Sequence, residues 1–77
     1  MEIDSNKVDE AVLALLWLTL HDGNRAWKNI QWEAMNRLYE KDVIANPRNK
    51  AKSVALSEEG LRLAEQKCRE LFARTER

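Results

Sequence analysis

The 77-residue sequence contains one cysteine and one histidine, so two common ways of stabilising a small domain are missing. Cys68 has no second cysteine with which to form a disulfide inside the chain, and His21 has no cysteines or carboxylates around it at metal-ligand spacing. We therefore expect no metal ion and no other cofactor. A chain of this length buries only about 60% of the surface that it exposes when unfolded. Helix packing and self-association remain as sources of stability.

An excess of charge of either sign is also missing. The 13 Lys and Arg residues balance 13 Asp and Glu residues, so no global field draws the chain to nucleic acid or to an anionic membrane. The longest apolar run, residues 11–20 with Thr19 as an interruption, is about half of the roughly 20 residues that a bilayer span requires. Glu2 and Asp4 precede this run, where a secretory signal would be cationic. We expect one cytoplasmic domain, residues 1–77, and no contact with membranes.

Capping residues and helical periodicity predict three main helices. The first extends over residues 5–21 and is expected to end at Asp22-Gly23, because glycine readily adopts the left-handed conformation that ends many helices. After it, residues 24–29 are expected to form one short helical turn. The other two main helices extend over residues 31–41 and from a cap at Ser57 to about residue 73.

A short β-hairpin is expected between the second and the last main helix. Two β-branched segments, residues 43–45 and 53–56, flank the turn signal Asn46-Pro47. The predicted fold class is mainly α with a small β-hairpin (α+β), in the order helix, short helix, helix, hairpin, helix. The apolar side chains expected to face the core from the last two helices are Trp32, Met35, Leu38, Tyr39, Leu61, Ala64, Cys68, Leu71 and Phe72.

This order of elements is that of a winged helix. The segments Leu38-Tyr39-Glu40-Lys41-Asp42-Val43-Ile44 and Val54-Ala55-Leu56-Ser57-Glu58-Glu59-Gly60-Leu61, with a basic loop between them, resemble a pattern of small bacterial winged-helix regulators. Asp42 stands where glycine is usual, and aspartate accepts left-handed geometry better than most residues. Ser57 replaces a threonine, and serine caps helices equally well. The second helix of the motif is shortened to residues 24–29.

Nearly the whole chain also resembles a family of bacterial proteins of roughly 80 residues that is known only as a domain of unknown function. The shared segments are Lys7-Val8-Asp9-Glu10-Ala11-Val12-Leu13-Ala14-Leu15-Leu16, His21-Asp22-Gly23 with Arg25-Ala26-Trp27-Lys28, and Lys50-Ala51-Lys52-Ser53-Val54. This resemblance implies a bacterial origin and a stand-alone domain, and it brings no activity with it.

The predicted hairpin, which would be the wing of a winged helix, carries a local excess of positive charge. Between residues 43 and 56 the charged side chains are Arg48, Lys50 and Lys52, with no acid among them. These three cations could contact DNA phosphates in a salt-dependent and sequence-independent way. They could equally protect an exposed hairpin from pairing edge to edge with another chain.

The outward face of the helix over residues 31–41 offers a mixed surface to DNA. Gln31, Asn36 and Arg37 could read base edges. Glu33 and Glu40 would approach phosphates unfavourably. The sequence therefore predicts weak DNA binding.

No residue pattern indicates catalysis or a small-molecule substrate. His21 lacks a nucleophile or metal partner and is expected to cap the first helix. Cys68 lies on an apolar stripe, where a small buried side chain is expected. The three tryptophans could line a ligand pocket, but they are more simply explained as core residues, with Trp27 the exception because Arg25 and Lys28 flank it. We predict that the protein is not an enzyme.

The first helix is apolar over most of its circumference, so either it runs through the middle of the fold or one of its faces meets a second chain. Leu13, Trp17 and Leu20 lie on one side of it, and Leu63 adds to the excess from the last helix. These four residues are the predicted interface of a homodimer. The sequence favours a non-enzymatic, homodimeric, winged-helix-like protein that binds DNA weakly as an accessory or regulatory protein. The alternative is a homodimeric protein-interaction module that does not bind DNA.

Overall fold

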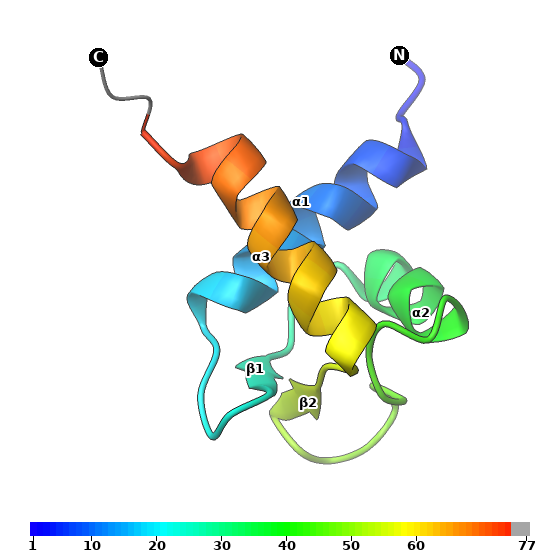
Figure 1. The fold of residues 1–77 in the computed structure, drawn as a ribbon. Coiled ribbons are helices and arrows are strands. Elements are labelled where there is room, and N and C mark those ends of the chain that lie inside the picture. Colours follow the sequence, from blue (N-terminus) through cyan, green and yellow to red (C-terminus); the bar gives the residue numbers. More distant parts are fainter. Residues whose placement is uncertain (75–77) are drawn as a thin grey trace.

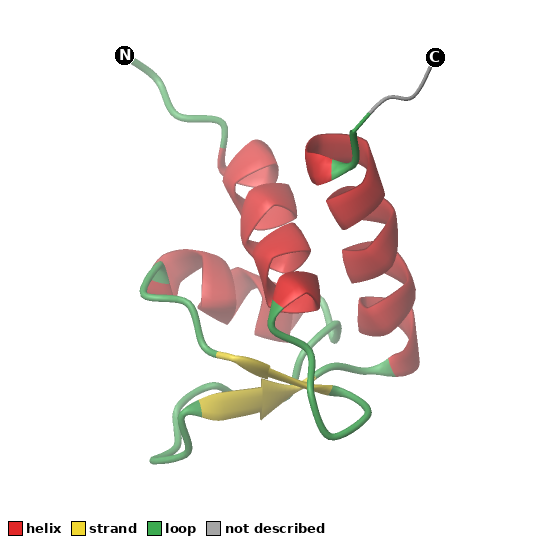
Figure 2. Ribbon diagram, turned by 90° about the vertical axis from the view of Figure 1, so that its left-hand side faces the viewer, coloured by secondary structure: helices red, strands yellow, loops and turns green. Residues whose placement is uncertain are grey.

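Three helices and a small β-sheet form the computed structural model of this chain, which describes residues 1–74. In chain order the elements are α1 (Ser5–Leu18), β1 (Arg25–Trp27), α2 (Trp32–Glu40), β2 (Ser53–Ala55) and α3 (Glu58–Phe72) (Figure 1). Helix α1 packs against both α3 and α2, and the sheet lies at the end of the α1 and α3 pair that is remote from the two chain termini (Figure 2). Within residues 1–74, no helix is long and apolar enough to cross a membrane.

The helices begin where the capping residues predict. The Asp4 carboxylate accepts hydrogen bonds from the backbone amides of Asn6 and Lys7, at 3.0 and 3.3 Å, and so caps α1. The Ser57 hydroxyl accepts a hydrogen bond of 3.0 Å from the amide of Gly60 and caps α3. Capping at these two positions fixes where each helix starts, and with it the face that each helix turns to the core.

The core lies where the three helices and the sheet meet. Leu16 of α1, Met35 of α2 and Val54 of β2 are its largest fully buried side chains. The other apolar residues buried in this cluster are Val12, Leu13, Ala26, Ala34, Leu38, Val43, Ile44, Leu56 and Ala64. One continuous cluster drawn from every element explains how so short a chain can bury enough apolar surface to fold.

The sheet is consistent with a winged-helix-like arrangement. Strands β1 and β2 are antiparallel, with Ala26 opposite Val54. On the other edge of β2, the amide of Ala45 donates to the carbonyl of Ala55 at 2.9 Å, and Ile44 forms an isolated bridge with Leu56. The chain after α2 therefore runs beside β2 on the side opposite β1. The predicted mainly α fold with a small β component is confirmed, and the arrangement is winged-helix-like.

The prediction that α1 continues to residue 21 is wrong. The helix ends at Leu18, and the hydroxyl of the next residue, Thr19, donates to a helix carbonyl at 3.3 Å and accepts from the amide of Trp27 at 3.2 Å. The chain then reverses, because His21 and Arg25 exchange two backbone hydrogen bonds of 2.7 and 3.0 Å. The positive φ of Gly23, 86°, belongs to this reversal and not to the end of the helix.

Two further expectations about the strands need correction. Residues 24–29 form no helical turn, since strand β1 occupies the middle of this segment. Residues 43–45 pair with β2 only through the single bridge, so β1, and not this segment, is the ladder partner of β2. The chain leaves the sheet after Ala45 because Pro47 has no amide hydrogen to donate to a ladder.

Candidate nucleic-acid interface

Residues 46–52, which we call the wing, form a loop held in shape by two asparagine side chains. The side-chain oxygen of Asn46 accepts from the amide of Arg48 at 2.9 Å, and that of Asn49 accepts from the amide of Ala51 at 3.0 Å. The ammonium group of Lys28, just after β1, donates to the backbone and side-chain oxygens of Asn49 at 3.0 and 2.9 Å. Local turns and one tether to the sheet therefore give the wing a defined conformation.

The cations of the wing point into solvent. Arg48, Lys50 and Lys52 are all exposed. None of the ion pairs formed within residues 1–74 includes them. Their positive charge is therefore available to a partner, and this exposure agrees both with phosphate binding and with the protection of the hairpin from pairing with another chain.

An open hollow of about 330 Å³ lies between the wing and α2. Trp32 and Asn36, one helical turn apart on α2, form one wall, and Pro47, Arg48 and Asn49 of the wing form the other. We call it the wing hollow. It brings together two residues that the sequence assigns separately to DNA binding, Asn36 from the helix and Arg48 from the wing. Gln31, a second helix candidate, is exposed and directly precedes Trp32.

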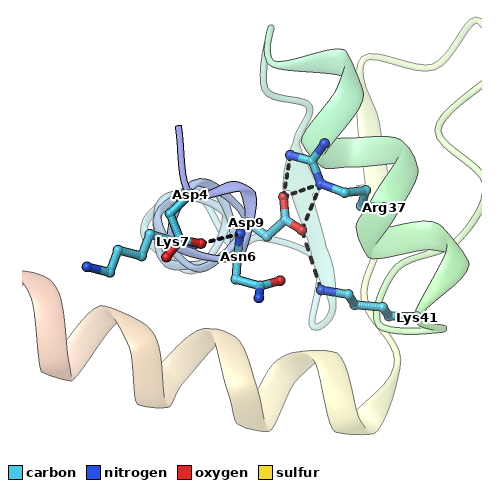
Figure 3. A network of polar contacts seen from close by, with 6 residues as sticks. All are labelled: Asp4, Asn6, Lys7, Asp9, Arg37 and Lys41. Atoms are coloured by element: carbon cyan, nitrogen blue, oxygen red, sulfur yellow. Dashed lines mark hydrogen bonds and ion pairs between the residues drawn. The ribbon is translucent and has the colours of Figure 1, made fainter. Parts of the chain in front are cut away.

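Arg37, the remaining helix candidate, is partly exposed and forms an ion pair with a buried carboxylate. Its guanidinium nitrogens contact both carboxylate oxygens of Asp9 on α1 at 2.8 to 3.0 Å, and the ammonium group of Lys41 approaches the same carboxylate at 3.4 Å (Figure 3). Asp9 is only 3% exposed, so its charge needs these partners. The hydrogen bond that Arg37 donates to the Asp9 carboxylate raises the pKa of the Arg37 guanidinium. The structure therefore uses Arg37 to clamp α2 onto α1, and its charge is not free for base recognition.

Trp32 is the site residue that the sequence misplaces. The predicted apolar stripe put Trp32 and Tyr39 in the core, but they are 57% and 41% exposed. Ala34 is fully buried beside Met35. The buried residues of α2 are Ala34, Met35 and Leu38, and at 100° of rotation per residue the centre of this buried face lies roughly 110° around the helix from Trp32. The sequence does indicate this buried face, but only through the small side chain of Ala34, and the larger apolar side chains of Trp32 and Tyr39 favoured the wrong face.

The four predicted dimer residues lie within the fold of their own chain. Leu13 is 4% exposed, and Trp17, Leu20 and Leu63 are partly buried and packed against the core. They are therefore not the surplus apolar surface that the sequence indicates. The sequence misses their burial because it does not show that α3 and the sheet cover this side of α1.

The surplus lies instead on another side of α1. Leu15, Leu18 and Trp27 are 42%, 60% and 53% exposed and line a hollow of about 270 Å³. We call these three residues the apolar patch. The exposure of Trp27 agrees with the exception made for it from its cationic neighbours.

The contacts of His21 and the position of Cys68 indicate a role in the fold for each. The Nδ1 atom of His21 lies 2.9 Å from the carbonyl oxygen of Thr19, and its ring stacks on Trp27 with the ring centres 4.6 Å apart. The imidazole thus meets a carbonyl group just beyond the end of α1. Cys68 is a free, half-buried cysteine on α3. In the part of the chain that the structure describes, no three His, Cys, Asp or Glu residues gather into a group that could hold a metal ion.

Comparison with known proteins finds likeness over nearly the full chain. Residues 4–74 match the family described as "Domain of unknown function (DUF6429)". The chain is 54% identical over 74 residues to "Uncharacterized protein y4hR" of Sinorhizobium fredii (strain NBRC 101917 / NGR234), which covers 96% of this chain and all of the relative. No solved structure matches significantly.

Proposed function

The chain belongs to the bacterial family described as a domain of unknown function, DUF6429, and this family assigns no activity to it. From the geometry of the site, we propose that the protein binds DNA weakly, through the wing and the exposed face of α2. The observation that carries the proposal is the wing hollow, where Asn36 and Arg48 meet. Cations on a loop fix the position of a nucleic-acid backbone, whereas amide side chains distinguish base edges. The hollow combines the two kinds of group in one place.

The charges of the described residues indicate that binding is weak. Three exposed cations of the wing are free of carboxylate partners, while α2 also carries the exposed Glu33 and Glu40. Each phosphate contact releases close to one counterion. Three contacts would make the affinity fall by about 40-fold between 50 and 200 mM salt, which is well below the range of strong DNA-binding proteins.

The test compares two variants that lose the same charge. In Lys50→Ala/Lys52→Ala two wing contacts are removed, so the affinity for all duplex sequences should fall and its change over the same salt range should shrink to about 3-fold. The control is Lys7→Ala/Arg69→Ala. Lys7 lies in the first turn of α1 and Arg69 in the last turn of α3. Both of these helix ends are remote from the sheet (Figure 2), so this variant should bind like the wild type. Fluorescence anisotropy with a random duplex at both salt concentrations measures this. Equal binding by the two variants would remove the wing from the mechanism, and a wild type that does not bind at low salt would overturn the proposal.

The apolar patch favours a second candidate function, a homodimeric protein-interaction module. Leu18 and Trp27 are more than half exposed and share a hollow with Leu15. Exposed apolar groups that gather around a hollow are typical of sites where another protein binds. A symmetric dimer through the patch would also add buried area to a thin core. This candidate and DNA binding use different surfaces and are compatible.

A further inference from the structure

The wing hollow contains a group that contact with a DNA backbone does not explain, the exposed indole of Trp32. Building on the proposed function, we propose that the hollow takes an unpaired nucleotide, whose base stacks on Trp32 and whose phosphate meets Arg48. The partner is then a single-stranded nucleic acid or an unpaired stretch within a duplex.

The walls of the hollow suit a base better than a base pair. Trp32 faces the hollow from α2, and Pro47, which is itself buried, lies on the wing side. Of the two, the exposed indole of Trp32 presents a flat apolar surface to the hollow. An unpaired base exposes its π-face and can stack on an indole, whereas a paired base in a duplex exposes only its edges in the grooves. The hollow is open to solvent and has a volume of about 330 Å³, which leaves room for a single base.

Of the polar side chains that line the hollow, Asn49 is hydrogen-bonded within the fold, whereas Asn36 and Arg48 can bind a ligand. The amide group of Asn49 is occupied, since its oxygen accepts from Lys28 and from the backbone, and its nitrogen donates to Asn46 at 3.3 Å. Within residues 1–74, the side-chain amide of Asn36 and the guanidinium of Arg48 form no hydrogen bond. An amide one helical turn from the indole can bond the edge of a base stacked there. The guanidinium can pair with its phosphate.

The experiment measures three ligands of equal length with the same protein: a labelled oligothymidine, a duplex, and an abasic deoxyribose-phosphate strand. Trp32→Ala should weaken binding to oligothymidine about tenfold, since stacking of a base on an aromatic side chain is worth about 1–3 kcal/mol. It should change binding to the duplex and to the abasic strand less than twofold. Trp32→Phe should retain most of the affinity, because phenylalanine also offers a π-face.

Phe72→Ala is the matched control for the loss of an exposed aromatic side chain. Phe72 is 46% exposed and ends α3, at the end of the molecule remote from the sheet (Figure 2). It should bind all three ligands like the wild type, and far-UV circular dichroism should show all variants folded. An equal loss on oligothymidine and duplex for Trp32→Ala would overturn the stacking inference and leave the proposed DNA binding in place. Wild-type protein that binds none of the three ligands would overturn both.

Discussion

A close approach between two backbone segments yields a sharp prediction at Gly60. This residue lies in the first turn of α3 and faces the carbonyl group of Val43, three residues beyond the end of α2. A Cβ atom built at Gly60 would overlap the carbonyl oxygen of Val43 and lie 2.9 Å from its carbonyl carbon. The obstacle is backbone, not the flexible end of a side chain, so Gly60→Ala requires α3 and the chain at Val43 to move apart.

Two opposing effects decide the sign of this substitution. Alanine favours a helix over glycine by up to about 1 kcal/mol. Against this, overpacking costs about 1–3 kcal/mol. The movement also stretches two hydrogen bonds at the junction, from Ser57 to the carbonyls of Val43 at 3.1 Å and of Asp42 at 2.9 Å, each worth about 1 kcal/mol. The net result should be a loss of about 2 kcal/mol in the free energy of unfolding, which is a large share of the stability of so small a domain.

Urea unfolding followed by tryptophan fluorescence and far-UV circular dichroism measures this loss by linear extrapolation. Gly23→Ala is the contrasting control. Gly23 has no atom within 4 Å of a built Cβ, but its φ is 86°, so its substitution should cost about 1 kcal/mol through backbone strain alone. A Gly60→Ala variant as stable as the wild type, or more stable, would refute the contact between α3 and Val43.

Two further predictions concern the apolar patch and the clamp on α2. Leu18→Glu should leave the chain folded and convert the dimer into a monomer, as measured by sedimentation at micromolar concentration. Leu13→Glu should unfold the chain, because it buries a charge. A wild-type protein that sediments as a monomer at high concentration would contradict the dimer. Asp9→Ala should lower the free energy of unfolding by about 2 kcal/mol in urea titrations, at the low end for a buried ion pair because the freed cations can reach water. Glu10→Ala, in which a half-exposed carboxylate is lost, should change it little, and equal effects of the two substitutions would contradict the clamp.

Features set by neighbouring residues were predictable from the sequence. Ser57 caps α3 where expected, since a cap depends on amides two or three residues away. Asp42 has a φ of 62°, the left-handed conformation expected where related patterns have glycine. Membership in a small bacterial family of unknown function is also confirmed.

Features set by distant partners were not predictable. Strand β1 is three residues long, and its partner β2 begins 26 residues after β1 ends, so local periodicity could not identify it. The burial of Leu13 depends in the same way on elements that follow it in the chain. The candidate site was half predicted for the same reason. The wing cations are exposed as expected, but the role of Arg37 was decided by Asp9, 28 residues away.

The pairing of Arg37 with Asp9 also explains why the wing, and not α2, should dominate any contact with DNA. Only residues 28–31 separate β1 from α2, so the fold lacks the helix that would support α2 in a complete winged-helix motif. The buried carboxylate of Asp9 takes over that support by holding Arg37 and Lys41 from the last turn and the end of α2. Both cations are thereby drawn toward α1, while Glu33 and Glu40 stay exposed on α2. The fold thus stabilises α2 with the charges that a recognition helix would present to phosphates, and unpaired positive charge remains on the wing.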